Sequence, residues 1–269
     1  MEKVTCNLCG ADNAAPWGEK DGIKIVQCRG CGLVYCNPRL DNDELQKFYS
    51  QEYFVEGHYE EDVLRQKMYA IEIEEIKRNL AVKGRLLDVG CAMGKFLHTL
   101  PSTFEKQGLE FSEAAAAMGR EKFGLNIVTG QIRHAAFPEK HFDIIQMRGV
   151  LEHSQDPFED LTHIRRFLKD DGVLRISQLP NIGSLCGQWF RAGFNQVKPK
   201  EHLYYFTPDT IRKMLARAGF RVRYMSFPYL NTPYASLAKD ILHMVTYKLQ
   251  KKDSPAFFGN MMILYAEKA

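Results

Sequence analysis

Four cysteines near the N-terminus have the residue type and spacing of a metal site. Cys6 and Cys9 form one C-x2-C pair, and Cys28 and Cys31 form a second pair after residues 10–27. Each pair can bring two thiolates to one ion from a tight turn, and four thiolates complete a closed tetrahedral zinc site. Because such a site keeps no open ligand position, we predict a structural zinc ion. A segment of about 40 residues buries too little core to fold alone, so the metal would supply its folding energy.

A glycine-rich turn followed by an acid could bind a nucleoside. Asp88 ends a short apolar run, Gly90 and Gly94 follow it, and Glu110 lies about 20 residues later. The glycines allow a ligand close to the backbone, and the carboxylate can accept hydrogen bonds from two ribose hydroxyls. The dinucleotide fingerprint G-x-G-x-x-G would require glycine at positions 92 and 95, where this chain has alanine and lysine. NAD is therefore disfavoured.

Alternating strands and helices must position these residues. A helical segment is expected at residues 59–80, and Gly84 separates it from the alternating part. Alternation of this kind is typical of a mainly parallel sheet with helices on both faces, and ligands bind at the carboxyl ends of such strands. The expected strands are residues 85–89, 108–111, 126–129, 142–147, 173–178, 221–227 and 260–266. The expected helices are residues 113–123, one beginning at Asp156 and Pro157, one beginning at Thr207 and Pro208, and residues 235–249.

Several motifs, in the correct order, resemble class I S-adenosylmethionine-dependent methyltransferases. LLDVGCAMGKFL resembles motif I of that family, GLEFSEAA its second motif, and FDIIQMRGVLEHSQDP its fourth strand with the following loop. LKDDGVLRISQLPN is similar to the segment that leads into strand five. EHLYYFTPDTIRKMLARAGF and CRGCGLVYCNPRL resemble a bacterial subgroup linked to sugar and glycan modification. The resemblance covers about residues 1–228 and implies an α/β, Rossmann-like, doubly wound seven-stranded sheet preceded by a small zinc ribbon.

The resemblance also implies a division of the chain. A zinc-ribbon module would occupy residues 1–40, a helical linker or cap residues 41–83, and the methyltransferase domain residues 84–269. Two insertions, at about 181–206 and 229–257, would cap the substrate. The first contains aromatic and cationic side chains that suit a nucleotide-linked sugar or an anionic glycan, although an ordinary capping helix has the same composition. The second contains the helix 235–249, which would either cover the pocket or form a homodimer contact.

By position, the resemblance implies a site for S-adenosylmethionine. Two positions depart from the family pattern: Ala92 replaces the usual middle glycine, and Gln131 replaces a common acid. The implied cofactor-binding residues are Asp88, Gly90, Cys91 and Gly94 at the methionine and ribose, Glu110 at the ribose hydroxyls, Phe111, Gln131 and Ile132 at the adenine, and Arg148 in the loop beneath the cofactor.

Two histidines are candidates for the catalytic base. The sulfonium of the cofactor already activates its methyl group, so the protein mainly aligns a nucleophile with the methyl–sulfur bond. A hydroxyl acceptor would also need a general base, and histidine is the usual choice near neutral pH. His153 and His202 are the candidates. Each also has a structural interpretation, His153 as a brace of its helix together with Glu152, and His202 as a solvated loop residue.

The composition indicates the cellular compartment of the protein and the kinds of partner that it does not favour. With 45% hydrophobic and 26% charged residues and a net charge of +3, the 269 residues are ordinary for a globular protein and do not favour nucleic acid as a partner. We expect no secretory signal and no membrane span, because no segment reaches about 18 apolar residues. Seven cysteines without a signal argue against disulfides and for a reducing cytoplasm. Cys36, Cys91 and Cys186 are expected to be buried or partly buried non-ligands.

Three classes of function stay open at this point. The leading hypothesis is methyl transfer to a small molecule or carbohydrate, with a sugar hydroxyl as the favoured acceptor. An RNA methyltransferase that holds nucleic acid with its zinc ribbon is the second, and the modest net charge counts against it. The third is a non-catalytic binding protein that keeps the cofactor fold, which the departures at Ala92 and Gln131 support.

Overall fold

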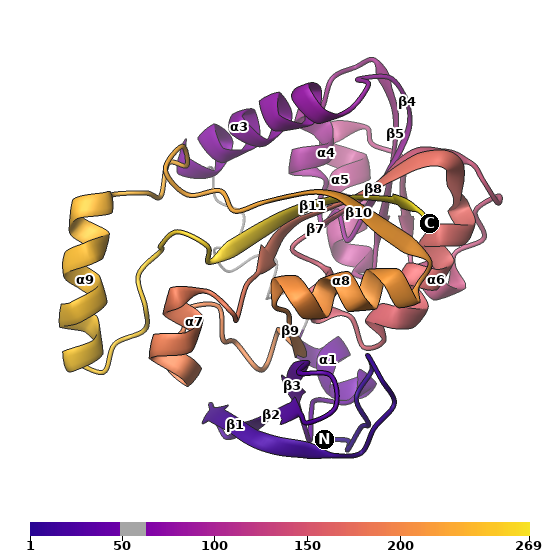
Figure 1. Cartoon of the computed structure of the whole chain (residues 1–269). Helices are drawn as coiled ribbons and strands as arrows, with labels where there is room; N and C mark the ends of the chain where they lie inside the picture. The colour runs from indigo at the N-terminus through magenta and orange to yellow at the C-terminus, as the bar shows by residue number, and fades with distance from the viewer. Residues whose placement is uncertain (49–62) are drawn as a thin grey trace.

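The computed structural model describes residues 1–48 and 63–269, and Figure 1 shows its two β-sheets with the helices around them. The smaller sheet has the order β1-β2-β3-β9, and the larger has the order β10-β11-β8-β7-β4-β5-β6. The strands are β1 (Ala14–Lys20), β2 (Ile23–Cys28), β3 (Val34–Cys36), β4 (Gly84–Val89), β5 (Phe104–Glu110), β6 (Ile127–Thr129), β7 (Phe142–Arg148), β8 (Leu168–Pro180), β9 (Tyr204–Tyr205), β10 (Phe220–Ser226) and β11 (Met261–Lys268). The helices are α1 (Asn42–Phe48), α3 (Val63–Asn79), α4 (Lys95–Thr99), α5 (Glu113–Phe123), α6 (Pro157–Phe167), α7 (Leu185–Phe190), α8 (Pro208–Arg217) and α9 (Leu237–Leu249).

The larger sheet confirms the predicted doubly wound, mostly parallel architecture. Strands β4, β5, β6, β7 and β8 pair in parallel, and β11 runs antiparallel between β8 and β10. Helices α3, α4 and α5 lie over one face and α6 and α8 over the other (Figure 1). Since both faces are covered, the central strands bury side chains on both sides, as Leu86 and Leu87 of β4 do.

The helices of this domain begin at the residues that the sequence indicated. Asp156 caps α6 by accepting a hydrogen bond from the Glu159 N–H, with Pro157 in the first turn. Thr207 caps α8 through a capping box with Thr210. These side chains satisfy backbone donors that have no partner inside a helix, which fixes where each helix starts.

Some strands are longer than predicted. Strand β5 begins at Phe104 rather than at residue 108, because its polar first half still pairs with β4 from Gly84 onward. Strand β8 begins at Leu168 rather than at residue 173, and its register against β7 shifts between Leu168 and Val173. Helix α3 lies within the predicted 59–80, of which residues 59–62 fall outside the described residues.

The N-terminal sheet is continuous with the rest of the molecule. Strand β3 pairs antiparallel with β9, which lies between β8 and α8 in the chain. Leu33 and Tyr35 of this sheet pack in the same buried cluster as Leu203 and Phe206. One sheet and one core therefore extend across the predicted boundary at residue 40. The division of the chain into domains at that residue stays a prediction. No helix among the described residues has the length and apolar character to cross a membrane.

Candidate active site and cysteine cluster

A cavity of about 270 Å³ opens at the carboxyl edge of the parallel strands. Its wall comes from the loops after β4, β5, β6 and β7, which are the loops that the sequence placed on one edge. Of the implied cofactor-binding residues, those that line the cavity are Gly90, Glu110, Phe111, Gln131 and Ile132.

The glycine loop has the backbone that a close ligand requires. Gly90 has φ +69°, and a Cβ there would lie 2.5 Å from Cγ2 of Val150, so only glycine fits. Ala92 has φ +51°, the left-handed conformation that favours glycine, although it carries a side chain. The loop therefore keeps its turn despite the alanine, and Ala92 directs its N–H toward Glu110.

Glu110 is fixed in the cavity wall by backbone donors. Its Oε2 accepts a hydrogen bond from the Ala92 N–H and its Oε1 from the Ser112 N–H, both at 2.8 Å. Burial raises the pKa of this carboxyl above its ordinary value. The side chain is thus an oriented acceptor for hydroxyl groups, at the end of β5 where the sequence expected it.

Three other implied residues, which belong to the glycine loop or to the end of β4 before it, do not line the cavity. Asp88 is buried, its Oδ1 has no hydrogen-bond partner within the described part of the chain, and burial raises its pKa to about 7. The Cys91 sulfur lies against Gly108 of β5, and Gly94 lies against Leu125. Cys91 and Gly94 pack the loop against β5 and Leu125, and the assignment of all three residues to the cofactor stays a prediction.

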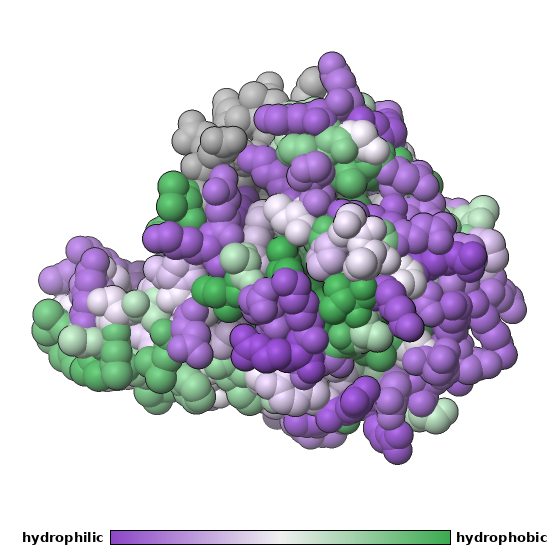
Figure 2. All heavy atoms as spheres, turned by 90° about the horizontal axis from the view of Figure 1, so that it is seen from above, coloured by the Kyte–Doolittle hydropathy of each residue, from purple (hydrophilic) through white to green (hydrophobic). Residues whose placement is uncertain are grey.

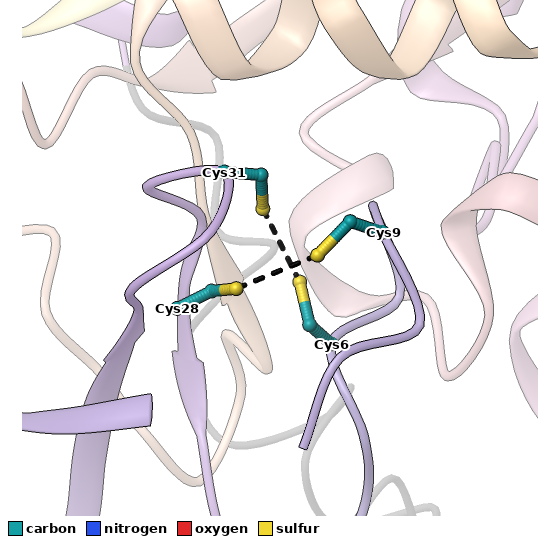
Figure 3. Close-up of side chains that lie close together, drawn as sticks. All are labelled: Cys6, Cys9, Cys28 and Cys31. Atoms are coloured by element: carbon teal, nitrogen blue, oxygen red, sulfur yellow. Dashed lines mark hydrogen bonds between the residues drawn. The ribbon is translucent and has the colours of Figure 1, made fainter. Parts of the chain in front are cut away.

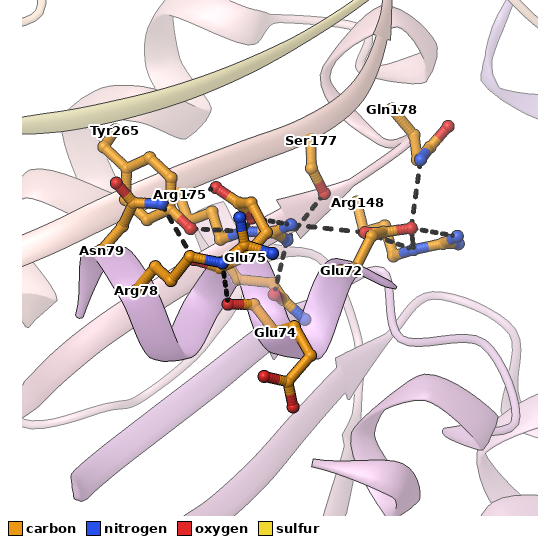
Figure 4. Close-up of polar contacts among 11 residues, drawn as sticks. Glu72, Glu74, Glu75, Arg78, Asn79, Arg148, Arg175, Ser177, Gln178 and Tyr265 are labelled. Atoms are coloured by element: carbon orange, nitrogen blue, oxygen red, sulfur yellow. Dashed lines mark hydrogen bonds and ion pairs between the residues drawn. The ribbon is translucent and has the colours of Figure 1, made fainter. Parts of the chain in front are cut away.

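Arg148 points away from the cavity, toward α3. Its guanidinium contacts both carboxylate oxygens of Glu72, with Nη2 at 2.8 Å and Nε at 3.1 Å (Figure 4). It also lies over the rings of Tyr69 and Phe96, 5.0 and 5.1 Å from their centroids. Any effect of Arg148 on a cofactor would therefore be indirect. The sequence offered no signal for Glu72, which is one acid among several on a helix.

The two candidate histidines lie together beside the cavity. His153 follows β7 in the short 3₁₀ turn Leu151–His153 and lines the cavity. The ring of His202 meets it edge-on with centroids 4.6 Å apart, and its Nδ1 lies 2.8 Å from the Gln196 carbonyl oxygen. Since His202 is only 5% exposed, its interpretation as a solvated loop residue is wrong. Burial lowers the pKa of His153 to about 4 and that of His202 well below its usual value.

Glu152 completes this cluster. It is buried, its Oε2 has no hydrogen-bond partner among residues 1–48 and 63–269, and its Oε1 lies 3.9 Å from Nε2 of His153. Burial raises its pKa to about 8. Its carbonyl oxygen accepts the Leu203 N–H, which joins the turn after β7 to the segment that carries His202. Both imidazoles are therefore neutral near neutral pH, which is the form that a general base requires.

Helix α1 contributes to the cavity, which sequence reasoning missed. Asn42 and Leu45 lie in its wall beside Gln131 and Arg133. Arg133 lies 3.3 Å from the Asp160 carboxylate of α6. Helix α1 falls within the predicted helical linker or cap, residues 41–83, but no motif indicated that it would line the cavity, because its place is set by tertiary packing.

The two predicted substrate caps do not contribute described residues to this cavity. In the first, Phe190 and Phe194 are buried in a core cluster with Trp17. In the second, α9 contributes no residue to the cavity wall. Their role as caps stays a prediction.

The four cysteines converge as predicted (Figure 3). The Cys6 and Cys31 sulfurs lie 3.4 Å apart, the Cys9 and Cys28 sulfurs 3.5 Å apart, and all four lie within 4.8 Å of one another. Gly10 and Gly32 close the two knuckles with N–H bonds to the carbonyl oxygens of Cys6 and Cys28. The arrangement suits one tetrahedral ion with soft ligands.

The other three cysteines are remote from this cluster. Cys36 and Cys186 are buried and Cys91 is partly buried, which confirms the expected burial.

A family model described as a methyltransferase domain matches residues 60–224, more than half of the chain. The chain belongs to the methyltransferase-domain family. Its seven-stranded sheet has the fold of class I S-adenosylmethionine-dependent methyltransferases.

Known proteins show the same fold. A malonyl-acyl-carrier-protein O-methyltransferase from Paenibacillus sp. is 23% identical over 188 residues, which are 64% of this chain and 68% of that protein. An S-adenosylmethionine-dependent methyltransferase from Thermotoga maritima has a TM-score of 0.60 and 20% identity, over 81% of this chain and 98% of that one. Magnesium protoporphyrin IX methyltransferase from Synechocystis PCC 6803, with bound SAH, has a TM-score of 0.58 and 14% identity, over 85% of this chain and all of that one.

Proposed function

We propose that this methyltransferase acts on a hydroxyl group of a small molecule or carbohydrate, most specifically a sugar that is free, nucleotide-linked or part of a glycan. One observation carries the proposal: His153 lines the cavity as a neutral imidazole, directly against His202 and Glu152. A hydroxyl needs such a base, whereas an already nucleophilic sulfur or amine has less need of one. The sugar class rests on the resemblance of the segment around His202 to the glycan-linked subgroup.

The chain's own residues fit S-adenosylmethionine at the glycine loop. Glu110 offers two oriented carboxylate oxygens to ribose hydroxyls, and Gly90 leaves room for a ligand against the backbone. Phe111 and Ile132 provide apolar walls for an adenine, and Gln131 provides an amide beside them. When bound, the cofactor supplies an activated methyl group.

His153 would serve as the general base. As the acceptor oxygen forms its bond to the methyl carbon and the methyl–sulfur bond breaks, the hydroxyl proton passes to the imidazole. His202 would be a positioning residue, because it lies behind His153 and the Gln196 carbonyl fixes its Nδ1 as a donor. Glu152 lies beside the His153 ring, with its Oε1 3.9 Å from Nε2 of His153, and would help to orient that ring.

We also infer a structural zinc ion held by Cys6, Cys9, Cys28 and Cys31. Their close sulfurs and glycine-closed knuckles support it. The thiols of this chain are free, which supports a reducing, cytoplasmic setting.

Methyl transfer to a panel of acceptors tests the proposal. We expect turnover with a hydroxyl acceptor in a nucleotide-sugar and free-sugar panel, measured by release of S-adenosylhomocysteine. His153→Gln should reduce kcat by about 100-fold or more, with S-adenosylmethionine affinity changed less than about twofold. Tyr205→Phe, a buried change beside His202 that leaves both histidines in place, is the matched control and should keep most of the activity.

Three outcomes would contradict the proposal. Full activity of the His153→Gln variant would exclude His153 as the general base. Turnover with RNA but with no hydroxyl compound of the panel would favour the RNA methyltransferase, and cofactor binding without any turnover would favour the non-catalytic protein. Ala92 keeps the loop in its left-handed turn, which supports an active chain over a degenerate one.

A further inference from the structure

Helix α9 presents a hydrophobic face that no described part of the chain covers. Its outward side chains are between 48% and 79% exposed. At 100° per residue they form one stripe about 140° wide, while Asp240 and Met244 face the body of the protein and are buried. Figure 1 shows α9 at one end of the molecule, apart from both sheets, and Figure 2 shows hydrophobic side chains gathered at that end. The stripe consists of Leu237, Ile241, Leu242, Val245 and Leu249.

The exposed apolar surface extends beyond the helix. Leu230 and Tyr234 precede it, Phe258 follows it, and all three are more than two-fifths exposed. Trp189 of α7 is also exposed, and its carbonyl oxygen accepts a hydrogen bond from Lys248 of α9. Contiguous apolar surface of this kind marks a contact with a partner or a membrane.

The surface around the stripe is cationic. At 100° per residue Lys239 lies beside one edge of the stripe and Lys248 lies within it, between Leu237 and Ile241. Lys251 and Lys252 follow the C-terminus of the helix, and all four lysines are exposed. The segment 228–258 has only two acids, Asp240 and Asp253.

Neither acid offsets these lysines. Asp240 is buried and accepts hydrogen bonds from the Tyr229 hydroxyl and the Ser236 N–H. Asp253 pairs with Lys20 of β1 at 2.8 Å. What remains at the surface is an apolar stripe with lysines beside it and one lysine, Lys248, within it.

A lipid surface matches this face better than a second copy does. A helix of 13 residues, about 20 Å long and about 10 Å wide, offers a footprint of about 200 Å², against about 800 Å² per partner in a stable dimer. A symmetric contact across the stripe would also bring like charges together. An apolar stripe edged by lysines is instead the pattern of helices that lie in the interface of an anionic bilayer.

We propose that α9 docks this protein on an anionic lipid surface, with its stripe among the acyl chains and its lysines against the headgroups. The helix connects β10 to the start of β11, and β11 is antiparallel to its neighbours, so α9 lies at the carboxyl edge of the parallel strands. The cavity opens at the same edge. Docking would therefore hold the cavity edge close to the lipid surface. The inference does not depend on methyl transfer, since docking is measured without cofactor.

Vesicle flotation of the full chain tests the proposal. We expect the protein to float with vesicles of phosphatidylcholine containing about one-third phosphatidylglycerol, and less with pure phosphatidylcholine or in 0.5 M NaCl. The double variant Ile241→Glu and Leu242→Glu should lose at least tenfold in lipid affinity. Val63→Glu on α3 is the matched control, because Val63 is as exposed as these residues and lies on another helix.

A charge variant separates the two contributions. Lys239→Gln with Lys251→Gln should weaken binding to the anionic vesicles by about 30-fold, since each lysine contributes about 1 kcal/mol at such a surface and about 1.4 kcal/mol is a factor of ten. It should leave binding to neutral vesicles unchanged. Thermal unfolding midpoints of all variants, whose substituted side chains are exposed, should match that of the original chain.

Three outcomes would overturn the proposal. One is the absence of flotation with anionic vesicles, and another is equal flotation of the Ile241 and Leu242 double variant. The third is a dimer by light scattering that becomes monomeric in that variant without any lipid binding, which would make the face an interface between two copies.

Discussion

Burial sets the protonation of the candidate catalytic groups, residue by residue. His153 and His202 are enclosed, so the cost of a buried charge keeps both imidazoles neutral. The same cost favours the protonated form of Glu152 and raises its pKa to about 8. A base that is neutral at physiological pH can accept the proton of a hydroxyl without first losing one.

The histidine environment predicts a pH dependence of stability. The pKa of His153 is lowered from 6.5 to about 4 in the folded chain, so between these values only the unfolded chain binds the proton. The free energy of unfolding should therefore fall as the pH drops from 6.5 toward 4, by about 1.4 kcal/mol per pH unit for this group. His153→Gln should reduce that slope, measured by urea unfolding at several pH values. An unchanged slope would show that His153 titrates normally in the folded chain.

Local motifs allowed some residues of the site to be predicted. Others could not be predicted, because tertiary contacts between distant segments bring them together. Gly90 and Glu110 lie within one strand–helix–strand unit, so their spacing alone placed them at a shared edge. The contact of His153 with His202 joins residues 49 positions apart, and no periodicity encodes it. Arg148 was assigned by resemblance to the cofactor loop, yet its partner Glu72 lies on a helix that precedes the whole alternating part.

At the scale of elements, a buried ion network attaches α3 to the central sheet (Figure 4). Glu72 lies 2.8 Å from Arg148 of β7 and 3.3 Å from Arg175 of β8, and Glu75 lies 2.9 Å from Arg175. Burial alone would raise the pKa of Glu72, but the charges of Arg148 and Arg175 lower it below its usual value. The network positions β7, whose end leads into the His153 turn.

Removing the Glu72 charge should destabilise the fold. Glu72→Gln would leave Arg148 and the fully buried Arg175 with too little negative charge, at a cost of about 3–5 kcal/mol. Glu74→Gln is the matched control on the same helix, because Glu74 is exposed and pairs only with Lys77, and it should cost less than about 1 kcal/mol. Chemical denaturation measures both. Equal effects of the two substitutions would contradict a role of the network in holding α3.

Element boundaries were predictable where apolar residues alternate with turns, and less so elsewhere. Helix α5 begins after Ser112 and ends at Gly124, as its cap residues indicated. The start of β5 was hidden because Glu105 and Lys106 are polar, although their backbones still pair with β4. Strand β9 was not predicted, since its two residues extend only because β3 lies beside them.

For the whole molecule, the cysteine module and the catalytic domain form one structure. Arg217 of α8 donates hydrogen bonds to the carbonyl oxygens of Asn7 and Leu8, between the first two cysteines. The Asn7 side chain bonds Asp156, the cap of α6, and Arg39 bonds the Gln155 carbonyl oxygen beside the cavity. Order in the module therefore supports the loop that carries His153.

Loss of the metal should affect the whole chain. We expect one zinc ion per chain by elemental analysis, and Cys6→Ser should lose it and lower the thermal unfolding midpoint by several degrees. Cys186→Ala is the matched control, since Cys186 is buried but remote from the cluster, and it should keep the zinc. A folded, purified chain without zinc would contradict a structural metal. So would a zinc-containing chain whose thermal unfolding midpoint is unchanged by chelation.

Calorimetric titration with S-adenosylmethionine tests the central claim most directly. The account predicts one site per chain. Affinity should fall about 10- to 100-fold in Glu110→Ala, because both oxygens of this carboxyl group are lost as acceptors for hydroxyl groups. Glu113→Ala should bind as the original chain does, because Glu113 is an exposed acid that pairs with Arg120 on the same helix. No binding by the folded chain, or equal binding by Glu110→Ala, would contradict the proposed cofactor site.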